Sequence, residues 1–331
     1  MKYTENAINI LTTKTYKGIG RAWIVKNLKG NESVESIVSL LNNNSKQDRT
    51  VTVGDFEDNK EQLRYKISRF EDCCDGLLAI GDKDFPKHRG NVKDGDRPMC
   101  LFYKGNINLL GVDNKNITVI GLLNPDNLIE AREQKIVAEI VKRGITIVSG
   151  LALGCDSISH RQAIEEGGKT IAILPSPLHN ILPKSNKNLA HEIVEGGGLL
   201  VTEYFDDFES GMELSSRYKD RDRLQALFCD AIVLAASYAQ DSNKRWKHLS
   251  GQKLDSGARL AMEYAKEYNI PRAVMYDQRI DYNNPMFDLN RQLINDKEKG
   301  VIIILTPSTL NDLINKILLD SSNDIQAELF S

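Results

Sequence analysis

The sequence lacks the features that mark secreted, membrane-spanning and zinc-binding proteins. Its five cysteines show no C-x-x-C spacing and are odd in number, which favours reduced thiols over a disulfide framework or a structural zinc site. No stretch approaches about 20 consecutive apolar residues, so no membrane span is expected. Residues 1–6 are polar and charged, without an apolar signal core. We therefore expect a cytoplasmic protein.

An excess of positive charge is also missing. The 331 residues include 43 Lys and Arg against 46 Asp and Glu, for a formal net charge of −3. This balance excludes a globally basic surface, so any nucleic-acid site must be a local patch or pocket. The length is sufficient for one large α/β domain and a smaller appendage.

The chain divides into four predicted parts. Residues 1–75 form a small helical module, because apolar side chains recur there at helical spacing. Residues 76–115 are punctuated by Gly and Pro and predict a connector packed on the core, with one strand at 99–103. Residues 116–310 form the main domain, and residues 311–331 form a helix end and a polar tail.

The helical module contains a short glycine turn, Lys17-Gly-Ile-Gly20. It resembles the turn of a helix-hairpin-helix, whose backbone amides can contact a DNA phosphate. A plain turn between two helices is the alternative.

Residues 116–310 alternate between apolar strands and amphipathic helices. Strands are predicted at 117–120, 145–149, 169–174, 198–202, 231–236, 272–276 and 301–305. Helices are predicted between most of them, near 156–166, 187–195, 217–229, 257–268 and 307–318. This alternation predicts an α/β fold with a Rossmann-like, doubly wound and mostly parallel sheet, preceded by the small all-α module.

The segment 147–160 is the strongest sign of a ligand. A buried strand ends at Ser149-Gly150, and a turn containing Gly154 leads into a helix. Such a turn directs unpaired N–H groups and a positive helix end at one point, which suits a phosphate. Asp156 is expected to cap this helix or to contact the ligand. His160 either packs against the next strand or lines the pocket.

Further polar residues follow other predicted strands, at the sheet edge where ligands of open parallel sheets collect. Lys184 and Asn186 follow one strand, and Glu203 ends another. Arg217, Arg221 and Arg223 share one predicted helix, where guanidinium groups repel one another unless an anion or neighbouring carboxylates lie among them. Asp220 and Asp222 offer such carboxylates, so both explanations stay open.

Several motifs, taken in order, resemble the DNA-processing protein A (DprA, also called Smf) family. They are Asp84-Phe-Pro-Lys-His88, Arg97-Pro-Met-Cys-Leu-Phe-Tyr-Lys-Gly105, Ile117-Thr-Val-Ile-Gly121, the loop Ser149 to Asp156 with His160, Gly168 to Leu174, Leu182-Pro183 with Asn186, Gly198 to Glu203, Arg221-Asp-Arg223 and Asp255-Ser-Gly257. The resemblance covers about residues 80–280. It implies an extended Rossmann fold that binds single-stranded DNA without chemistry, catalytic residue, metal or cofactor. It further implies a homodimer that helps to load a RecA-type recombinase during natural transformation.

The resemblance assigns the strand phosphates to a basic pocket. Its expected residues are Ser149, Gly150, Gly154, Asp156, His160, Lys184, Asn186, Arg217, Arg221 and Arg223. Backbone amides together with Arg and Lys side chains can hold successive phosphates.

The chain departs from the family pattern in three places. The turn Gly121-Leu-Leu-Asn124 lacks the arginine of the family's Gly-x-Arg, and Asp222 stands where the family has a neutral asparagine. Residues 238–254 resemble an insertion, in which Lys244, Arg245 and Trp246 form either an accessory platform for a single strand or an ordinary solvated loop. Glu203 and Gly257 are further accessory candidates.

Two other functions stay open. The same scaffold can serve as a sensor of a nucleotide or signalling phosphate, for example in phage or plasmid defence. It can also serve as an enzyme of the nucleotide-monophosphate phosphoribohydrolase kind, with His160 and Glu203 as acid and base.

Overall fold

The computed structural model describes residues 1–44, 46, 49–252, 254, 257–296, 301–306, 308–315 and 317. Asp255 and Ser256 of the predicted motif, and most of the predicted tail, lie outside these residues. No helix of the described ranges combines the length and the apolar character needed to cross a membrane.

A mostly parallel sheet forms the centre of the molecule. Its strands are β1 (Lys2–Tyr3), β2 (Gly76–Ala79), β3 (Cys100–Gly105), β4 (Asn116–Ile120), β5 (Thr146–Ser149), β6 (Thr170–Ile173), β7 (Leu199–Thr202), β8 (Ala231–Leu234), β9 (Arg272–Met275) and β10 (Val301–Ile304). Their order is β1-β2-β3-β7-β6-β5-β4-β8-β9-β10. Only β3 runs antiparallel to its neighbours β2 and β7, so the described sheet confirms the predicted Rossmann-like α/β fold.

Helices cover both faces of this sheet. On one face, α5 (Asn127–Val141) and α6 (Cys155–Glu165) share a buried apolar cluster with alternate residues of β4 and β5. On the other face, α8 (Gly211–Leu227) and α10 (Gly257–Glu267) pack on the intervening residues. Since the strands are buried on both sides, they read as continuous apolar runs.

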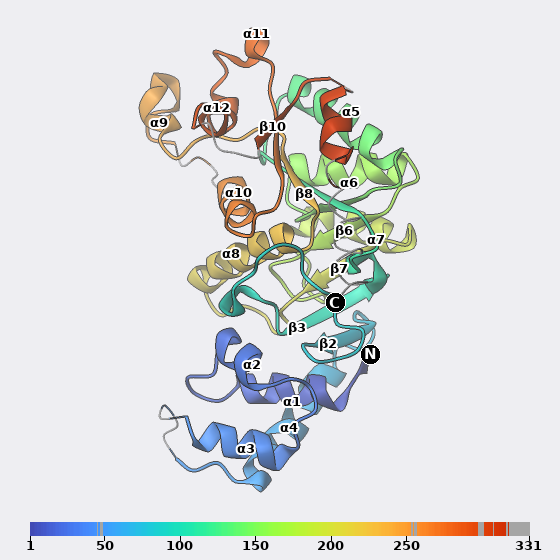
Figure 1. Cartoon of the computed structure of the whole chain (residues 1–331), viewed down its shortest axis with the longest axis vertical. Helices are drawn as coiled ribbons and strands as arrows, with labels where there is room; N and C mark the ends of the chain where they lie inside the picture. The colour runs from blue at the N-terminus through green and yellow to red at the C-terminus, as the bar shows by residue number, and fades with distance from the viewer. Residues whose placement is uncertain are drawn as a thin grey trace, which may run out of the picture.

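Four helices form one end of the molecule. They are α1 (Glu5–Lys14), α2 (Arg21–Asn27), α3 (Val34–Asn42) and α4 (Val53–Ser68), drawn in blue in Figure 1. The short helices α9 (Ser242–Arg245), α11 (Gln278–Asp281) and α12 (Asp288–Asn295) lie at the opposite end, and α7 (Lys187–Glu195) lies beside the sheet. The strands β1 and β2 were not predicted, because both are short and lie within or next to a helical segment.

One helix begins earlier than predicted. We predicted a helix over 217–229, whereas α8 starts at Gly211. Ser210 caps it by accepting a hydrogen bond from the Glu213 N–H at 3.2 Å. The pattern Ser210-x-x-Glu213 is a typical helix start, so this signal was present in the sequence.

Candidate functional site

A cleft of about 510 Å³ opens at the carboxyl ends of β4 and β5. This volume lies within the range of about 300 to 1,000 Å³ that is usual for small-ligand sites. The cleft lies between the loops that follow these strands and the helices α8 and α10. Its lining consists of Ile120, Gly121, Leu123, Ala152, Leu153, Asp156, Pro183, Ser215, Tyr218, Lys219, Arg221, Asp222, Gln225, Gly257, Ala258 and Leu260.

The loop after β5 is folded around one carboxylate. Asp156 Oδ2 accepts hydrogen bonds from the backbone N–H groups of Gly150 at 3.1 Å and Ala152 at 3.2 Å. Between these residues, Leu151 is fully buried and has a φ of 59°, a conformation that a leucine keeps only where its surroundings impose it. The predicted phosphate-binding amide of Gly150 is therefore already paired within the protein.

Asp156 is not the cap of α6, contrary to one of our two predictions for it. Gly154 occupies the cap position, with φ 68° and ψ −128°. A side chain at this position would point at the Leu122 carbonyl oxygen. A Cβ at Gly154 would lie 2.2 Å from that oxygen, so only glycine fits. The Asp156 carboxylate points back into the loop, since two loop amides and an arginine attract it there.

Arg221 is the arginine that meets this loop. Its Nη1 lies 3.3 Å from Asp156 Oδ2, and its Nε lies 3.4 Å from Asp222 Oδ1. Burial raises the pKa of Asp156, although Arg221 and the backbone amides of the loop oppose the shift. Gly150 leaves room for the guanidinium, because a Cβ there would lie 1.6 Å from Arg221 Nη1.

Arg217 lies on the same helix but has other partners. Its guanidinium donates to Glu213 Oε1 at 2.6 Å and to the Asp206 carbonyl oxygen at 2.7 Å. It also lies 4.2 Å from the centre of the Tyr204 ring, within cation–π range. Arg217 is buried and is absent from the cleft lining.

Arg223 points to a third place. It forms an ion pair with Glu203 and donates to the Asp96 carbonyl oxygen, and both charged side chains are buried. The arginines of α8 therefore do not converge on one point. The protein's own carboxylates balance them, so the repulsion that we considered in the sequence does not require a bound anion.

Three further predicted residues differ in how they relate to the cleft. His160 is fully buried, and its Nδ1 lies 2.7 Å from Thr170 Oγ1 on β6; burial lowers the pKa of this imidazole to about 3. Asn186 donates to the Leu151 carbonyl oxygen at 2.8 Å and so supports the loop from behind. Lys184 is exposed, next to Pro183 of the cleft lining.

Ser149, His160 and Glu203 all have internal partners. Ser149 Oγ donates to the Val119 carbonyl oxygen at 2.7 Å. His160 and Glu203, the acid and base of the enzyme hypothesis, contact different residues, and neither belongs to the cleft lining. The structure therefore does not place His160 and Glu203 together in this cleft.

The accessory candidates occupy two places. Gly257 begins α10 and lines the cleft. Lys244 and Arg245 are exposed on α9 and line a separate polar hollow of about 570 Å³. Trp246 is half-buried, and its indole Nε1 donates to Asp288 Oδ2 at 2.8 Å.

One face of α8 was missed by the sequence analysis. Ser215, Tyr218, Lys219 and Asp222 all line the cleft. Their spacing of i, i+3, i+4 and i+7 places them on one side of a helix. Recognising α8 from Ser210 onward would have revealed this polar face.

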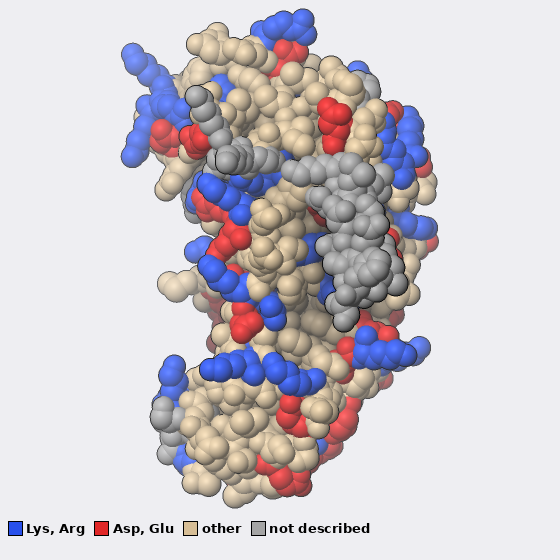
Figure 2. All heavy atoms as spheres, viewed as in Figure 1, with Lys and Arg blue, Asp and Glu red and all other residues tan. Residues whose placement is uncertain are grey.

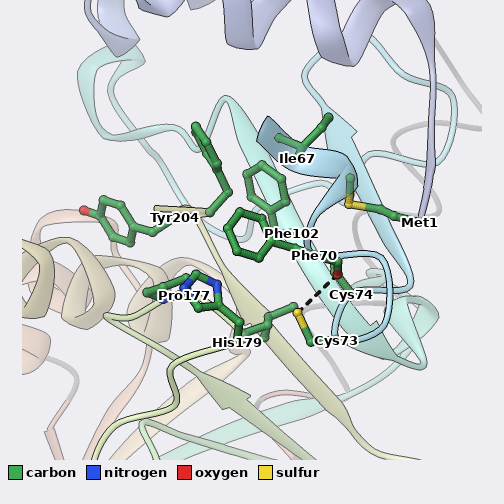
Figure 3. Close-up of a pocket in the computed structure, with 11 residues that line it drawn as sticks. Met1, Ile67, Phe70, Cys73, Cys74, Phe102, Pro177, His179 and Tyr204 are labelled. Carbon is green, nitrogen blue, oxygen red and sulfur yellow. Dashed lines mark hydrogen bonds between the residues drawn. The ribbon is translucent and has the colours of Figure 1, made fainter. Parts of the chain in front are cut away.

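A second, apolar pocket lies near the N-terminus, where Met1 and Ile67 approach the Phe70 and His179 rings (Figure 3). These two rings stack with their centres 4.2 Å apart. The pocket has a volume of about 10 Å³, room for about one water molecule at most. It is a small gap between packed apolar side chains. Within the described ranges no cluster of His, Cys, Asp or Glu gathers that could hold a metal ion.

Comparisons with curated proteins find relatives over about half of the chain. The chain is 29% identical over 160 residues to protein Smf of Borreliella burgdorferi, covering 48% of each chain. It is 32% identical over 164 residues to DNA processing protein DprA of Streptococcus pneumoniae, covering 48% of this chain and 53% of that one. The chain thus spans about half the length of the curated relatives it matches.

Solved structures show the same fold over more of the chain. The X-ray structure of DprA from Streptococcus pneumoniae matches with a TM-score of 0.67 at 21% identity, over 94% of this chain and 98% of that one. A structure describing the single-stranded DNA binding mode of DNA processing protein A from Helicobacter pylori matches with a TM-score of 0.55 at 25% identity, over 74% and 96%. The family model for DNA recombination-mediator protein A matches residues 76–242. The chain therefore belongs to the DNA recombination-mediator protein A family, the DprA/Smf family.

Proposed function

We propose that the cleft binds single-stranded DNA without covalent chemistry. The observation that carries this proposal is that Lys219, Arg221 and Tyr218 line the same cleft. Cationic side chains can hold backbone phosphates, and an aromatic ring can stack on a base of any identity. Family membership supports the proposal, since the Helicobacter pylori relative is described by its single-stranded DNA binding mode.

The cleft combines these cations with two carboxylates. Asp156 and Asp222 both lie in its lining, within 3.4 Å of Arg221 nitrogens. They lower the local positive potential, so Lys219 and the neighbouring Lys184 must supply much of the attraction for phosphate. Binding is therefore expected to be weak at high salt and to depend on these lysines.

Anisotropy titrations of single-stranded and double-stranded oligonucleotides at two salt concentrations test the proposal. Lys219→Gln should weaken single-strand binding and lower the magnitude of the salt slope by about 0.7, the value for one phosphate contact on a single strand. Tyr218→Ala should remove about 1–3 kcal/mol of stacking. Lys142→Gln, at the far end of α5 and 57% exposed, is the matched control.

The proposal fails if the folded protein does not bind single strands at low salt, or if Lys219→Gln and Lys142→Gln bind equally. Arg221→Ala is a weaker test, because it also leaves Asp156 buried without its arginine. Lys184→Gln is expected to resemble Lys219→Gln, since Lys184 is exposed beside the cleft.

The proposal extends to assembly. We propose a homodimer with a RecA-type recombinase as its partner during recombination or transformation; membership of a recombination-mediator family supports this. Light scattering on the purified chain tests the dimer, and co-purification with a RecA-type protein in the presence of single strands tests the partner.

A second candidate is a sensor of a nucleotide or signalling phosphate in the same cleft. Its size of about 510 Å³ suits a small ligand, and its two carboxylates can accept hydrogen bonds from a sugar or base. A thermal-shift screen separates the candidates: stabilisation by a mononucleotide, with no response to oligonucleotides, favours the sensor.

A further inference from the structure

The N-terminal helical module has one strongly basic segment. Residues 6–31 contain five Lys and Arg residues and no Asp or Glu, whereas acidic residues outnumber basic ones in the whole chain. The apolar residues of this segment face inward. Lys14, Lys17, Lys26 and Lys29 are exposed, so the outer surface of α1, α2 and their connection is basic.

Nearby carboxylates are already engaged elsewhere. Asp94, beside α2, lies 3.3 Å from Arg97, and the Glu32 carboxylate accepts the backbone N–H groups of Lys29 and Gly30 at 2.7 and 3.0 Å. Within the part of the chain that the structure describes, no carboxylate pairs with Lys14, Lys26 or Lys29. Their positive charge is therefore available to a ligand.

An ion pair attaches this segment to the cleft-forming helix. Arg21, the first residue of α2, pairs with Asp220 of α8, and Tyr204 donates to the other Asp220 oxygen at 2.7 Å. Asp220 lies between Lys219 and Arg221, both of which line the cleft. This ion pair therefore holds the first residue of α2 against the helix that forms one wall of the cleft.

Lys14 is the last residue of α1, the helix that packs against α2 and β3. Burial raises the pKa of the Cys100 thiol, at the start of β3, and the Lys14 ammonium is near enough to oppose that shift. Figure 2 shows Lys and Arg spheres in a row along the edge of the N-terminal lobe that faces the rest of the molecule. Arg21 and Lys26 are separated by about 7.5 Å along the axis of α2.

We propose that the α1–α2 segment, through Lys14 and Lys26, is a second contact for single-stranded DNA, holding phosphates of the strand as it leaves the cleft over α8. This inference rests on the proposed function of the cleft. Lysines recognise phosphates without regard to sequence, and a charged path beside a stacking site is the usual way to extend a single-strand site. The cleft then holds a few nucleotides, and longer strands gain affinity from the module.

The test compares oligothymidine of about 6 nucleotides with one of about 30, because single-strand sites span roughly 4–16 nucleotides. The double variant Lys14→Gln/Lys26→Gln should bind the long strand roughly tenfold more weakly, with a salt slope smaller in magnitude by about 1.4. Its binding of the short strand should equal that of the wild type. Lys66→Gln, an exposed lysine of α4 in the same module, is the matched control.

Two results overturn the inference and leave the cleft proposal intact. In the first, the double variant binds the long strand like the wild type while Lys219→Gln weakens both lengths. In the second, the double variant weakens binding of a duplex of equal length but not of the single strand. Failure of the wild type to bind either strand instead overturns the cleft proposal and, with it, this inference. All of the substituted lysines are exposed, so an unchanged melting temperature confirms that each variant is folded.

Discussion

Arg221 Nη1 lies 3.3 Å from Asp156 Oδ2 at the edge of the cleft, and both side chains are buried. The same Asp156 oxygen orders the loop after β5 through the amides of Gly150 and Ala152. One carboxylate thus links the loop geometry to the position of the cleft's arginine.

Asp156→Asn should destabilise the protein by about 3 kcal/mol, because it leaves Arg221 buried with less compensating charge. Urea unfolding measures this loss. Asp113→Asn, at an exposed position, should change the free energy of unfolding by less than about 0.5 kcal/mol. An Asp156→Asn protein as stable as the wild type would contradict the link.

Gly150→Ala should displace Arg221 or the loop, since the new Cβ would lie 1.6 Å from Arg221 Nη1. We expect a loss of stability of about 2 kcal/mol or more and weaker binding of single strands. The matched control is Gly211→Ala in the first turn of α8, where a Cβ meets no atom within 4 Å. This change should be neutral or stabilise by up to about 1 kcal/mol.

Glu133→Gln should change how stability depends on pH. Burial raises the pKa of Glu133 to about 8, and its Oε1 accepts a hydrogen bond from Ser159 Oγ at 2.7 Å. The folded state therefore keeps a proton that the unfolded chain releases above its ordinary value of 4.5. The resulting stabilisation is fully present below about pH 4.5 and is lost as the pH rises through about 8.

Unfolding in urea at pH 7 and pH 9 measures this effect as a difference between variant and wild type. The stability of the variant should increase relative to that of the wild type as the pH rises from 7 to 9. Glu165→Gln, at an exposed position of α6, is the control. A difference that does not vary with pH would show that Glu133 is ionised in the folded protein.

Trp246→Phe tests whether this side chain anchors the 242–249 segment or serves as a platform for bases. The phenyl ring keeps an aromatic face but loses the indole N–H that donates to Asp288. If Trp246 is an anchor, Trp246→Phe should lower the free energy of unfolding by about 1 kcal/mol. The backbone amide hydrogens of the segment should then exchange faster with solvent. The single-strand affinity of Trp246→Phe should stay within about twofold of the wild type. If Trp246→Ala, but not Trp246→Phe, shows a large loss of single-strand affinity, Trp246 serves as a stacking platform.

Much of the fold could be predicted from the sequence. The apolar runs of β4 to β10 and the stripes of α7 and α10 have the periods of strands and helices, which depend only on local geometry. The short β1 and β2 could not be predicted, because a strand of two to four residues has too few positions to show a period. Their pairing with β3 depends on contacts between distant parts of the chain.

The candidate site was predicted less completely. The loop from Ser149 to Asp156 was located from its glycines and its strand, and the cleft does lie beside it. Arg217 and Arg223 were grouped with Arg221 because they are close in sequence. Arg223, two positions from Arg221, points in a different direction on the helix. Arg217 lies four positions from Arg221 and so on the same side of the helix, but its guanidinium pairs with Glu213, and each of the three arginines has its own carboxylate.

The sequence by itself determined the α/β class, the order of β3 to β10 along the chain and the loop at which a ligand site forms, because these depend on local period and on glycine. Only the tertiary structure decided which charges remain available to a ligand. Arg217, Arg223 and Glu203 are balanced inside the protein, whereas Lys184 and Lys219 lie at the cleft. Charge pairing depends on distances of a few ångströms between side chains that the chain brings together from far apart, and no sequence pattern specifies those distances.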